Sequence, residues 1–392
     1  MASTEKFETA AIHAGQAPDL QTGAVVPPVH RASTFKQDGV GRLRDGYEYA
    51  RSDNPTRRAL EANLAALESV SLDAATKTDV RGFAFASGLA AEDNLMRALL
   101  KPGSHLVISI DAYGGTTRLA KRVLPKWGVS HTALDLQDLA ALERLLIEKK
   151  TDLVWVETPT NPTLRVIDIE AVSKIAHAHG ALVVVDNTFA SPYLQQPLAL
   201  GADFVLHSTT KYLGGHSDVI GGAVITKTKE HAEEIKFLQN ASGAVPGPDD
   251  CYLVLRGTKT LAVRVQRHCE NAKAVAEFLS EHPQVAQVFW PGLTTHPNHD
   301  VAKRQMRDFG GMVSFRHSGG PEGAAAMAGA TEVFTLAESL GGVESLIEVP
   351  AAMTHASVAD TESAVPPDLV RLSVGIEHID DLLVDLDKAL AG

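Results

Sequence analysis

The sequence predicts an α/β protein with a mostly parallel, doubly wound sheet and a smaller α/β C-terminal domain. Short apolar runs alternate with helical segments, and the runs "TDLVWVET" and "ALVVVDN" are continuously apolar, which is typical of strands covered on both faces. Hydrophobic residues make up 44% of the chain but aromatic residues only 5%, which favours an α/β fold over a β-sandwich. A chain of 392 residues is longer than a single hydrophobic core usually supports, so we expect two domains.

Residues 1–60 are predicted to form an N-terminal arm. The segment "TGAVVPPVHRASTF" is rich in turn-forming residues, and "GYEYARSDNPTRR" leads into the helical "RRALEANLAALE". An irregular segment of this length is expected either to be disordered or to pack on a partner. The aromatic residues Phe35, Tyr47 and Tyr49 favour packing.

Residues 61–256 are predicted to form the large domain. The apolar run "GFAFA" is followed by the helical "SGLAAEDNLMRALL", by the turn "KPG" and by the strand "HLVIS". Between "TDLVWVET" and "ALVVVDN" lies the helical "IEAVSKIAHAHG", which ends on Gly180, a residue suited to a helix C-terminus. This βαβ series predicts the parallel sheet.

Residues 257–392 are predicted to form the C-terminal domain. A long amphipathic helix, "TLAVRVQRHCENAKAVAEFLSEHP", precedes four further strand candidates. These are "VAQVFWPG", "GGMVSFRH", "VESLIEVP" and "LVRLSVGIE".

Composition excludes several classes of function. The formal net charge is −12 and no Lys/Arg-rich run occurs, which argues against nucleic-acid binding. Apolar runs are too short to span a bilayer, and the N-terminus lacks the apolar core of a signal peptide. Two cysteines, Cys251 and Cys269, cannot build a disulfide framework, so we expect a cytoplasmic protein. His296 and His299 lack a third ligand nearby, so no metal site is predicted.

Three features lie where strands are expected to end, which is where open parallel sheets bind ligands. Ser87 and Gly88 open a helix after "GFAFA", Asp186 ends "ALVVVD", and Lys211 follows "DFVLHS". Each alone has an ordinary interpretation, as a helix cap, a structural salt bridge or a surface lysine. Together they provide an anion site at a helix start, a partly desolvated carboxylate and a lysine among hydroxyls. These are the groups that hold pyridoxal phosphate (PLP).

Long motifs resemble the Cys/Met-metabolism family of PLP-dependent enzymes. They include "ETPTNPTLRVID", "VDNTFASPYLQQPLALGADFVLHSTTKYLGGHSDVIGG" and "AESLGGVESLIEVPAAMTHAS". The resemblance extends from "IHAG" to "RLSVGIE", nearly the whole chain. It implies the fold of aspartate aminotransferase-type PLP enzymes and a homotetramer, a dimer of dimers with shared active sites.

The resemblance also implies roles for individual residues. Lys211 matches the lysine that binds the cofactor aldehyde covalently and later moves protons. Asp186 matches the carboxylate that keeps the pyridine nitrogen protonated, and Tyr113 matches a tyrosine that stacks on the ring and assists proton transfer. The phosphate would be held by Gly88, Leu89, Ser208 and Thr210, and, from the neighbouring subunit, by Tyr49 and Arg51. The substrate would be bound by Arg371, on its α-carboxylate, and by Ser339, Glu338 and Arg118.

Within the family, two activities remain open. Gly115 departs from methionine γ-lyases, which have cysteine there, and Glu338 and Arg118 resemble the γ-type enzymes rather than β-lyases. The segment "IEVPAAMTHAS" favours cystathionine γ-lyase, which releases cysteine, 2-oxobutyrate and ammonia. The alternative is cystathionine γ-synthase, which replaces the γ-acyloxy group of an O-acylhomoserine by the sulfur of cysteine.

Two hypotheses of other classes are weaker. A binding scaffold derived from a former enzyme would be expected to lose Lys211 or Arg371, and both are present. A nicotinamide-dependent dehydrogenase would be expected to have G-x-G-x-x-G after a strand, and the chain has no such motif there.

Overall fold

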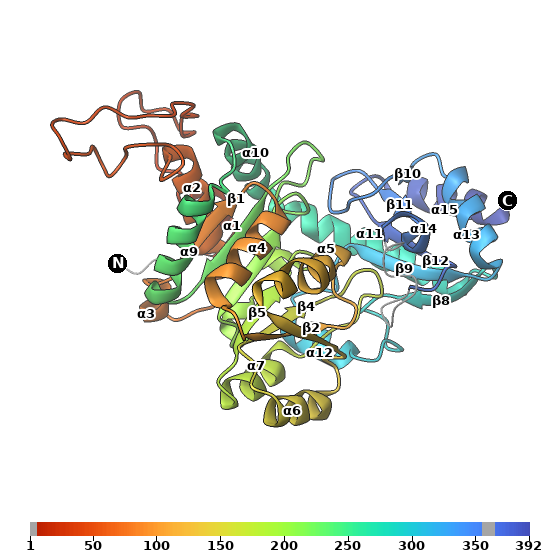
Figure 1. Cartoon of the computed structure of the whole chain (residues 1–392). Helices are drawn as coiled ribbons and strands as arrows, with labels where there is room; N and C mark the ends of the chain where they lie inside the picture. The colour runs from red at the N-terminus through yellow and green to blue at the C-terminus, as the bar shows by residue number, and fades with distance from the viewer. Residues whose placement is uncertain (1–5, 355–364) are drawn as a thin grey trace.

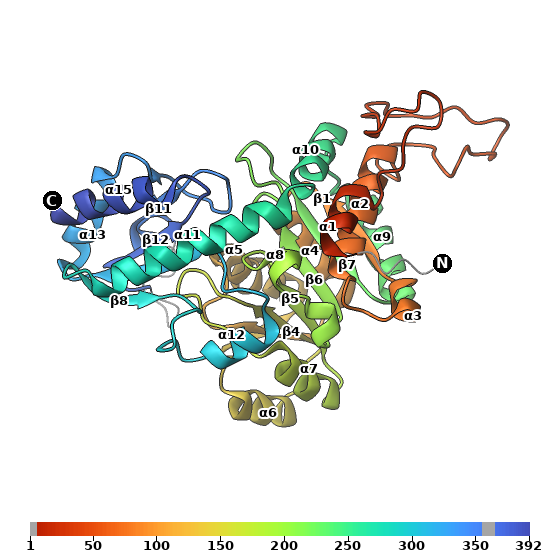
Figure 2. The ribbon, with the colours of Figure 1, turned by 180° about the vertical axis from the view of Figure 1, so that it is seen from behind.

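The computed structural model describes residues 6–354 and 365–392. They form a larger unit and a smaller C-terminal unit (Figure 1). The helix α11 (Leu261–Glu281) runs from one unit into the other (Figure 2). Its first half packs in the core of the larger unit and its second half in the C-terminal core. The predicted α/β fold with a smaller C-terminal sheet is confirmed.

The larger unit is built on a seven-stranded sheet with the order β1-β7-β6-β5-β4-β2-β3. Strands β2 to β6 run parallel, and β7 lies antiparallel to both of its neighbours. The strands are β1 (Arg81–Phe85), β2 (His105–Ser109), β3 (Ser130–Leu134), β4 (Leu153–Glu157), β5 (Leu182–Asp186), β6 (Phe204–Ser208) and β7 (Gly222–Thr226).

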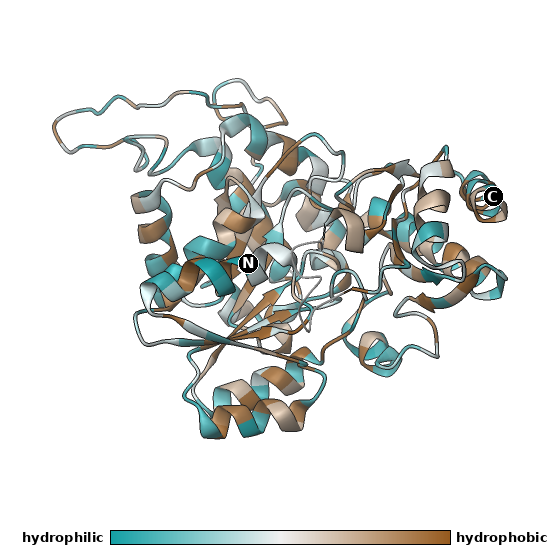
Figure 3. Ribbon diagram, turned by 45° about the vertical axis from the view of Figure 1, so that its right-hand side comes forward, coloured by the Kyte–Doolittle hydropathy of each residue, from teal (hydrophilic) through white to brown (hydrophobic). Residues whose placement is uncertain are grey.

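The continuous apolar runs form central strands because helices cover both faces of the sheet. Leu153, Val183 and Val184 have no exposed surface. Strands at the centre are mostly hydrophobic, whereas the covering helices carry both hydrophobic and hydrophilic residues (Figure 3). The helices are α1 (Phe7–His13), α2 (Pro55–Glu68), α3 (Ala74–Lys77), α4 (Gly88–Leu99), α5 (Gly114–Arg118), α6 (Leu139–Glu148), α7 (Ile169–Ala178), α8 (Ser191–Leu194), α9 (Lys229–Ser242) and α10 (Pro248–Thr258).

The N-terminal arm is shorter than the irregular segment predicted from sequence. Residues 7–13 form helix α1, whose Phe7 is buried in the main core. The side-chain amide of Asn63 on α2 donates to carbonyls at the end of α1, including that of Ala14 at 3.0 Å. The irregular part projects away from the body in Figure 1 and rejoins it at α2. There Asn54 caps α2 by accepting from two backbone amides.

The C-terminal unit contains a five-stranded sheet with the order β10-β11-β12-β9-β8. All its strand pairs are antiparallel except β10 with β11. Its strands are β8 (Val285–Phe289), β9 (Met312–His317), β10 (Thr335–Leu336), β11 (Leu346–Glu348) and β12 (Leu369–Ser373), and its helices after α11 are α13 (Gly320–Ala330), α14 (Pro350–Met353) and α15 (Ile379–Ala391). Helix α12 (His299–Gln305) follows β8 in sequence but packs on the larger unit, where Ala302 is part of the main core.

Strands β3, β7 and β10 were not predicted. Strand β3, with the sequence "SHTAL", lies at the edge of the sheet and is half-exposed, so it lacks an apolar run. Strand β7 is fully buried but short, and it begins at the second glycine of the pair Gly221 and Gly222. Strand β10 spans only two residues.

No helix among the described residues is long and apolar enough to cross a membrane. Cys251 and Cys269 are buried and free.

Candidate active site

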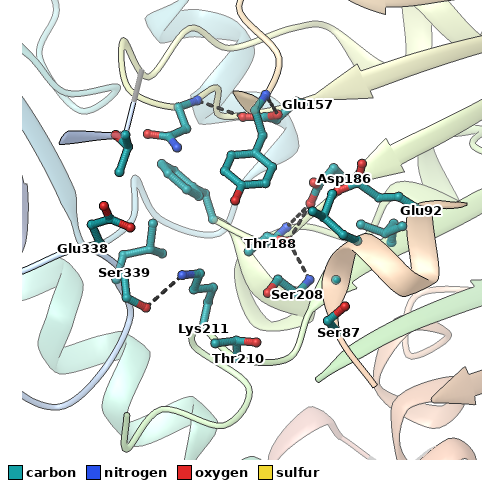
Figure 4. Close-up of a pocket in the computed structure, with 18 of the residues that line it drawn as sticks. Ser87, Glu92, Glu157, Asp186, Thr188, Ser208, Thr210, Lys211, Glu338 and Ser339 are labelled. Carbon is teal, nitrogen blue, oxygen red and sulfur yellow. Dashed lines mark hydrogen bonds between the residues drawn. The ribbon is translucent and has the colours of Figure 1, made fainter. Parts of the chain in front are cut away.

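A cavity of about 310 Å³ lies at the carboxyl ends of β4, β5 and β6, and the C-terminal unit closes one side of it (Figure 4). The structure brings most of the predicted site residues together there. They are Gly88, Leu89, Tyr113, Asp186, Ser208, Thr210, Lys211, Glu338, Ser339 and Arg371. Parallel strands place their carboxyl ends at one edge, which explains why residues far apart in sequence converge.

One end of the cavity has the properties of an anion site. Helix α4 begins at Gly88 and is capped by Ser87, whose hydroxyl accepts from the amide of Ala90 at 3.0 Å. The first amides of a helix have no carbonyl partner within it, and they lie at the positive end of the helix dipole. Ser208 packs closely against Gly88, where a Cβ would lie only 3.0 Å from that of Ser208. The Thr210 hydroxyl also lines this end and accepts from the amide of Gly221.

Asp186 and Glu157 form a pair of buried carboxyls at neighbouring strand ends, because they are register partners in β5 and β4. Thr188 donates to Asp186 Oδ1 from its amide, at 3.0 Å, and from its hydroxyl, at 2.6 Å. Burial raises the pKa of both carboxyls, and the charge of Asp186 raises that of Glu157 further. Glu157 accepts from the amides of Tyr113 and Asn161, so it fixes the loops at the cavity wall.

Lys211 lies in the loop after β6 and donates from Nζ to Ser339 Oγ at 2.8 Å. Burial and the positive charge of Arg371 lower the pKa of Lys211 to about 8, although Glu348 and Glu338 oppose the shift. Ser339 has a φ of +94°, a conformation rare for a residue with a side chain and often found at functional sites. A lysine with a lowered pKa supplies the neutral amine that attacks an aldehyde.

Arg371 is held rigidly in the opposite wall. Its Nη1 donates to Asn161 Oδ1 at 2.9 Å and pairs with Glu348 Oε1 at 3.0 Å, and its Nη2 donates to the carbonyl of Ser339 at 2.7 Å. Glu348 and Arg371 are register partners in β11 and β12. Arg371 Nε is buried and has no partner within the described residues, so the guanidinium retains a donor for an anion.

Three predicted site residues do not line this cavity. Arg118 is exposed at the end of α5, although its charge lowers the pKa of Tyr113 against the larger, raising effect of burial. Tyr49 and Arg51 lie on the arm, where the Arg51 guanidinium is 5.6 Å from the centre of the Tyr49 ring. Tyr49 is 48% exposed. Their role at the site of a neighbouring subunit remains a prediction.

Several cavity residues were not predicted. Glu157 could have been recognised, because it ends the apolar run "LVWV" as Asp186 ends "LVVV". Glu92 and Thr188 also line the cavity, but the surrounding sequence resembles an ordinary helix and an ordinary turn. Asn161 and Glu348 lie far in sequence from Arg371, so only the fold reveals that they hold it.

The cavity residues fit PLP. The start of α4 offers amides and hydroxyls to a phosphate, Asp186 offers a buried carboxylate to a pyridine nitrogen, and Lys211 offers an amine to the aldehyde. No group of three or more metal-ligating side chains occurs in the described part of the chain.

Comparisons with known proteins agree with this fit. The family model "Cys/Met metabolism PLP-dependent enzyme" matches residues 8–391. The chain is 59% identical to the cystathionine γ-synthase of Mycobacterium tuberculosis over 382 residues, 97% of this chain and 96% of that protein. It is 51% identical to a cystathionine β-lyase of Lactococcus lactis over 388 residues, 98% of each chain. It is 48% identical to the cystathionine γ-lyase of Dictyostelium discoideum over 388 residues, 98% of this chain and 97% of that one.

A solved structure of metB from Corynebacterium glutamicum has a TM-score of 0.95 and 52% identity, and the match covers 100% of this chain and 99% of the other. The predicted fold and cofactor dependence are therefore confirmed. The chain belongs to the Cys/Met metabolism family of PLP-dependent enzymes.

Proposed function

We propose that the protein is a cystathionine γ-synthase, which joins cysteine to the γ-carbon of an O-acylhomoserine. The observation that supports this most strongly is the 59% identity with the mycobacterial γ-synthase over almost the whole chain. Identity with the γ-lyase is 48%. The comparisons thus support the alternative of the sequence-based interpretation better than its first choice, the γ-lyase.

The γ-lyase remains the second candidate because of the segment "IEVPAAMTHAS". Residues 355–357 of this segment lie outside the described residues. Residues 347–354 include Glu348 and Thr354, whose hydroxyl donates to Glu348 at 3.1 Å. Thr354 therefore helps to hold Glu348, which pairs with Arg371. Because Arg371 would bind the α-carboxylate of either substrate, this contact does not distinguish the two activities. A cytoplasmic location and a tetramer remain predictions.

In the proposed mechanism, Arg371 binds the substrate α-carboxylate through its guanidinium. PLP, when bound, supplies an electron sink that accepts the electrons released when C–H bonds break. Lys211 would remove the Cα proton and deliver it elsewhere on the substrate, because it lines the cavity and has a lowered pKa. Such general acid–base catalysis contributes about 10²–10⁴-fold.

The two candidate activities are separated by product analysis. The purified holoenzyme is incubated with an O-acylhomoserine and cysteine, and separately with cystathionine alone. A γ-synthase forms cystathionine in the first reaction with a larger kcat/KM than it forms 2-oxobutyrate in the second. A larger kcat/KM for 2-oxobutyrate release from cystathionine would instead support the γ-lyase.

Replacing Asp186 by alanine is expected to lower kcat by about 10²–10³-fold, the range for removing one preorganised electrostatic contact. KM is expected to change much less, because the charge matters most in the transition state. Steady-state kinetics at saturating PLP measure both constants. Asp186→Asn, which keeps the shape and removes the charge, should lose turnover as well. Unchanged turnover in a fully loaded Asp186→Ala enzyme would exclude this role.

Replacing Arg371 by lysine is expected to raise KM for the amino-acid substrate by about 10- to 100-fold. Lysine cannot make a bidentate contact with a carboxylate, and a hydrogen bond to a charged group contributes about 1.5–3 kcal/mol. Arg316→Lys is the matched control, because Arg316 pairs with Asp368 on the same sheet but outside the cavity. If both variants keep the wild-type KM and kcat, another residue binds the carboxylate.

A further inference from the structure

Besides Glu157, a further carboxyl group, Glu92, lies beside Asp186 at the wall of the cavity (Figure 4). It stands on the second turn of α4, the helix whose first turn forms the anion site. Glu92 is only 3% exposed, and its Oε2 has no hydrogen-bond partner among the described residues. An unpaired, buried carboxylate is costly, so this group needs a physical explanation.

The surroundings of Glu92 disfavour a negative charge. Burial, and then the charge of Asp186, raise the pKa of Glu92 to about 8, while the hydroxyl of Thr116 opposes the shift less strongly. Glu92 in turn raises the pKa of Tyr113, although burial is the larger cause there. No cation from the described residues contributes to the shift of Glu92.

Asp186 and Glu92 differ in the hydrogen bonds that they accept. Asp186 accepts from both the amide and the hydroxyl of Thr188, and hydrogen bonds to the ionised form favour that form. Glu92 Oε2 receives none from the described residues. When two buried carboxyls are close, one of them retains its proton. The hydrogen bonds therefore place the negative charge on Asp186 and the proton on Glu92.

We propose that Glu92 is a positioning residue that holds a proton beside Asp186 and so adds no negative charge there, which leaves Asp186 to bind the pyridine nitrogen of PLP. Of the other groups that face Asp186, Glu157 accepts from two backbone amides, and His207 favours the ionised form of Asp186. This proposal rests on the cofactor of the family and is independent of the choice between γ-synthase and γ-lyase. Above the pH at which Glu92 loses its proton, a second negative charge would appear next to Asp186.

Infrared difference spectroscopy of the holoenzyme tests the protonation state directly. A protonated carboxyl has a carbonyl stretch that an ionised carboxylate lacks. At pH 7 the wild type is expected to have a component of this band that Glu92→Gln lacks, whereas any component from Glu157, whose pKa is also raised, should appear in both. In wild type the Glu92 component should disappear as the pH rises past about 8. The matched control is Asp93→Asn, because Asp93 is the next residue of α4 but pairs with Arg97 outside the cavity. A spectrum without a Glu92-dependent band at pH 7 would overturn the proposal.

A second readout distinguishes this role from a merely structural one. The visible absorption of the bound cofactor should change at alkaline pH in wild type and in Asp93→Asn, and that change should be absent in Glu92→Gln. In the holoenzyme the Lys211 amine is proposed to be bound covalently to the cofactor, and protonation of that bond also changes the visible absorption. The infrared band therefore decides which group is responsible.

Thr116→Val keeps the shape of Thr116 but removes a buried hydroxyl that lowers the pKa of Glu92, although this hydroxyl forms no hydrogen bond within the described residues. This variant should shift the loss of the infrared band to higher pH, even if Glu92→Gln fails to fold. An unchanged midpoint in Thr116→Val would count against the assignment of the band to Glu92.

Discussion

Replacement of Lys211 by alanine is expected to lower turnover by at least about 10²–10⁴-fold, because the variant loses its general acid–base group. It should also lose the visible absorption that arises from a covalent bond between the cofactor and a lysine. Lys211 is the only lysine among the described residues that line the cavity. With a pKa of about 8, about a quarter of its amine is neutral at a pH of about 7.5, against about one in a thousand at the usual pKa.

The control for this prediction is Lys227→Ala. Burial also lowers the pKa of Lys227, whose Nζ donates to the carbonyl of Gly201 at 3.1 Å, but this residue lies outside the cavity. Its loss should leave turnover and the visible spectrum close to wild type. Addition of a small primary amine should restore part of the activity of Lys211→Ala, since the amine replaces the missing group. A Lys211→Ala enzyme with a normal spectrum and normal turnover would exclude the proposed covalent role.

Much of the fold could be predicted because buried strands have long apolar sequences. The runs at β4 and β5 are apolar on both faces, and their ends identify the edge where ligands bind. The three features that suggested PLP, at Gly88, Asp186 and Lys211, all line one cavity in the structure. Local signals were sufficient for these residues because each one lies at the end of a strand or within three residues of it.

Other parts of the site depend on tertiary packing and have weak local signals. Glu92 lies three and four residues before the buried Leu95 and Met96, so it shares their helix face. Nevertheless, "AEDN" resembles a solvent-exposed turn, and sequence alone did not indicate that Glu92 faces Asp186. The supports of Arg371 come from β11 and from the loop after β4, segments that only the folded chain brings together.

The second large effect is expected from residues of the N-terminal arm that are predicted to act at the active site of a neighbouring subunit. Leu20, Val25 and Val40 on the arm are between 79% and 106% exposed. Exposed apolar side chains gathered in one segment are typical of a surface that a partner covers. Tyr49 and Arg51 lie on this same segment and do not line the cavity of their own chain. We therefore expect them to complete the cavity of a neighbouring subunit.

Two inactive variants should then restore activity to each other when they are mixed. If one chain carries Lys211→Ala and the other Arg51→Ala, each mixed dimer has one site with both lesions and one site with neither. Closed two-fold symmetry makes the sites equivalent before mutation. Random pairing of equal amounts should therefore restore about one quarter of the wild-type activity. The variants are unfolded and refolded together and then assayed, after each alone has been shown to be nearly inactive.

The matched control mixes Lys211→Ala with Asp186→Ala. Both of these residues line the cavity of the same chain, so every site in a mixed dimer still carries one lesion, and no activity should return. Recovery in the first mixture but not in the second can arise only if Arg51 acts across the subunit interface. If verified hetero-oligomers of the first mixture regain nothing, Arg51 serves its own subunit or no site. The arm would then need another explanation, while the roles of Lys211 and Asp186 would be unaffected.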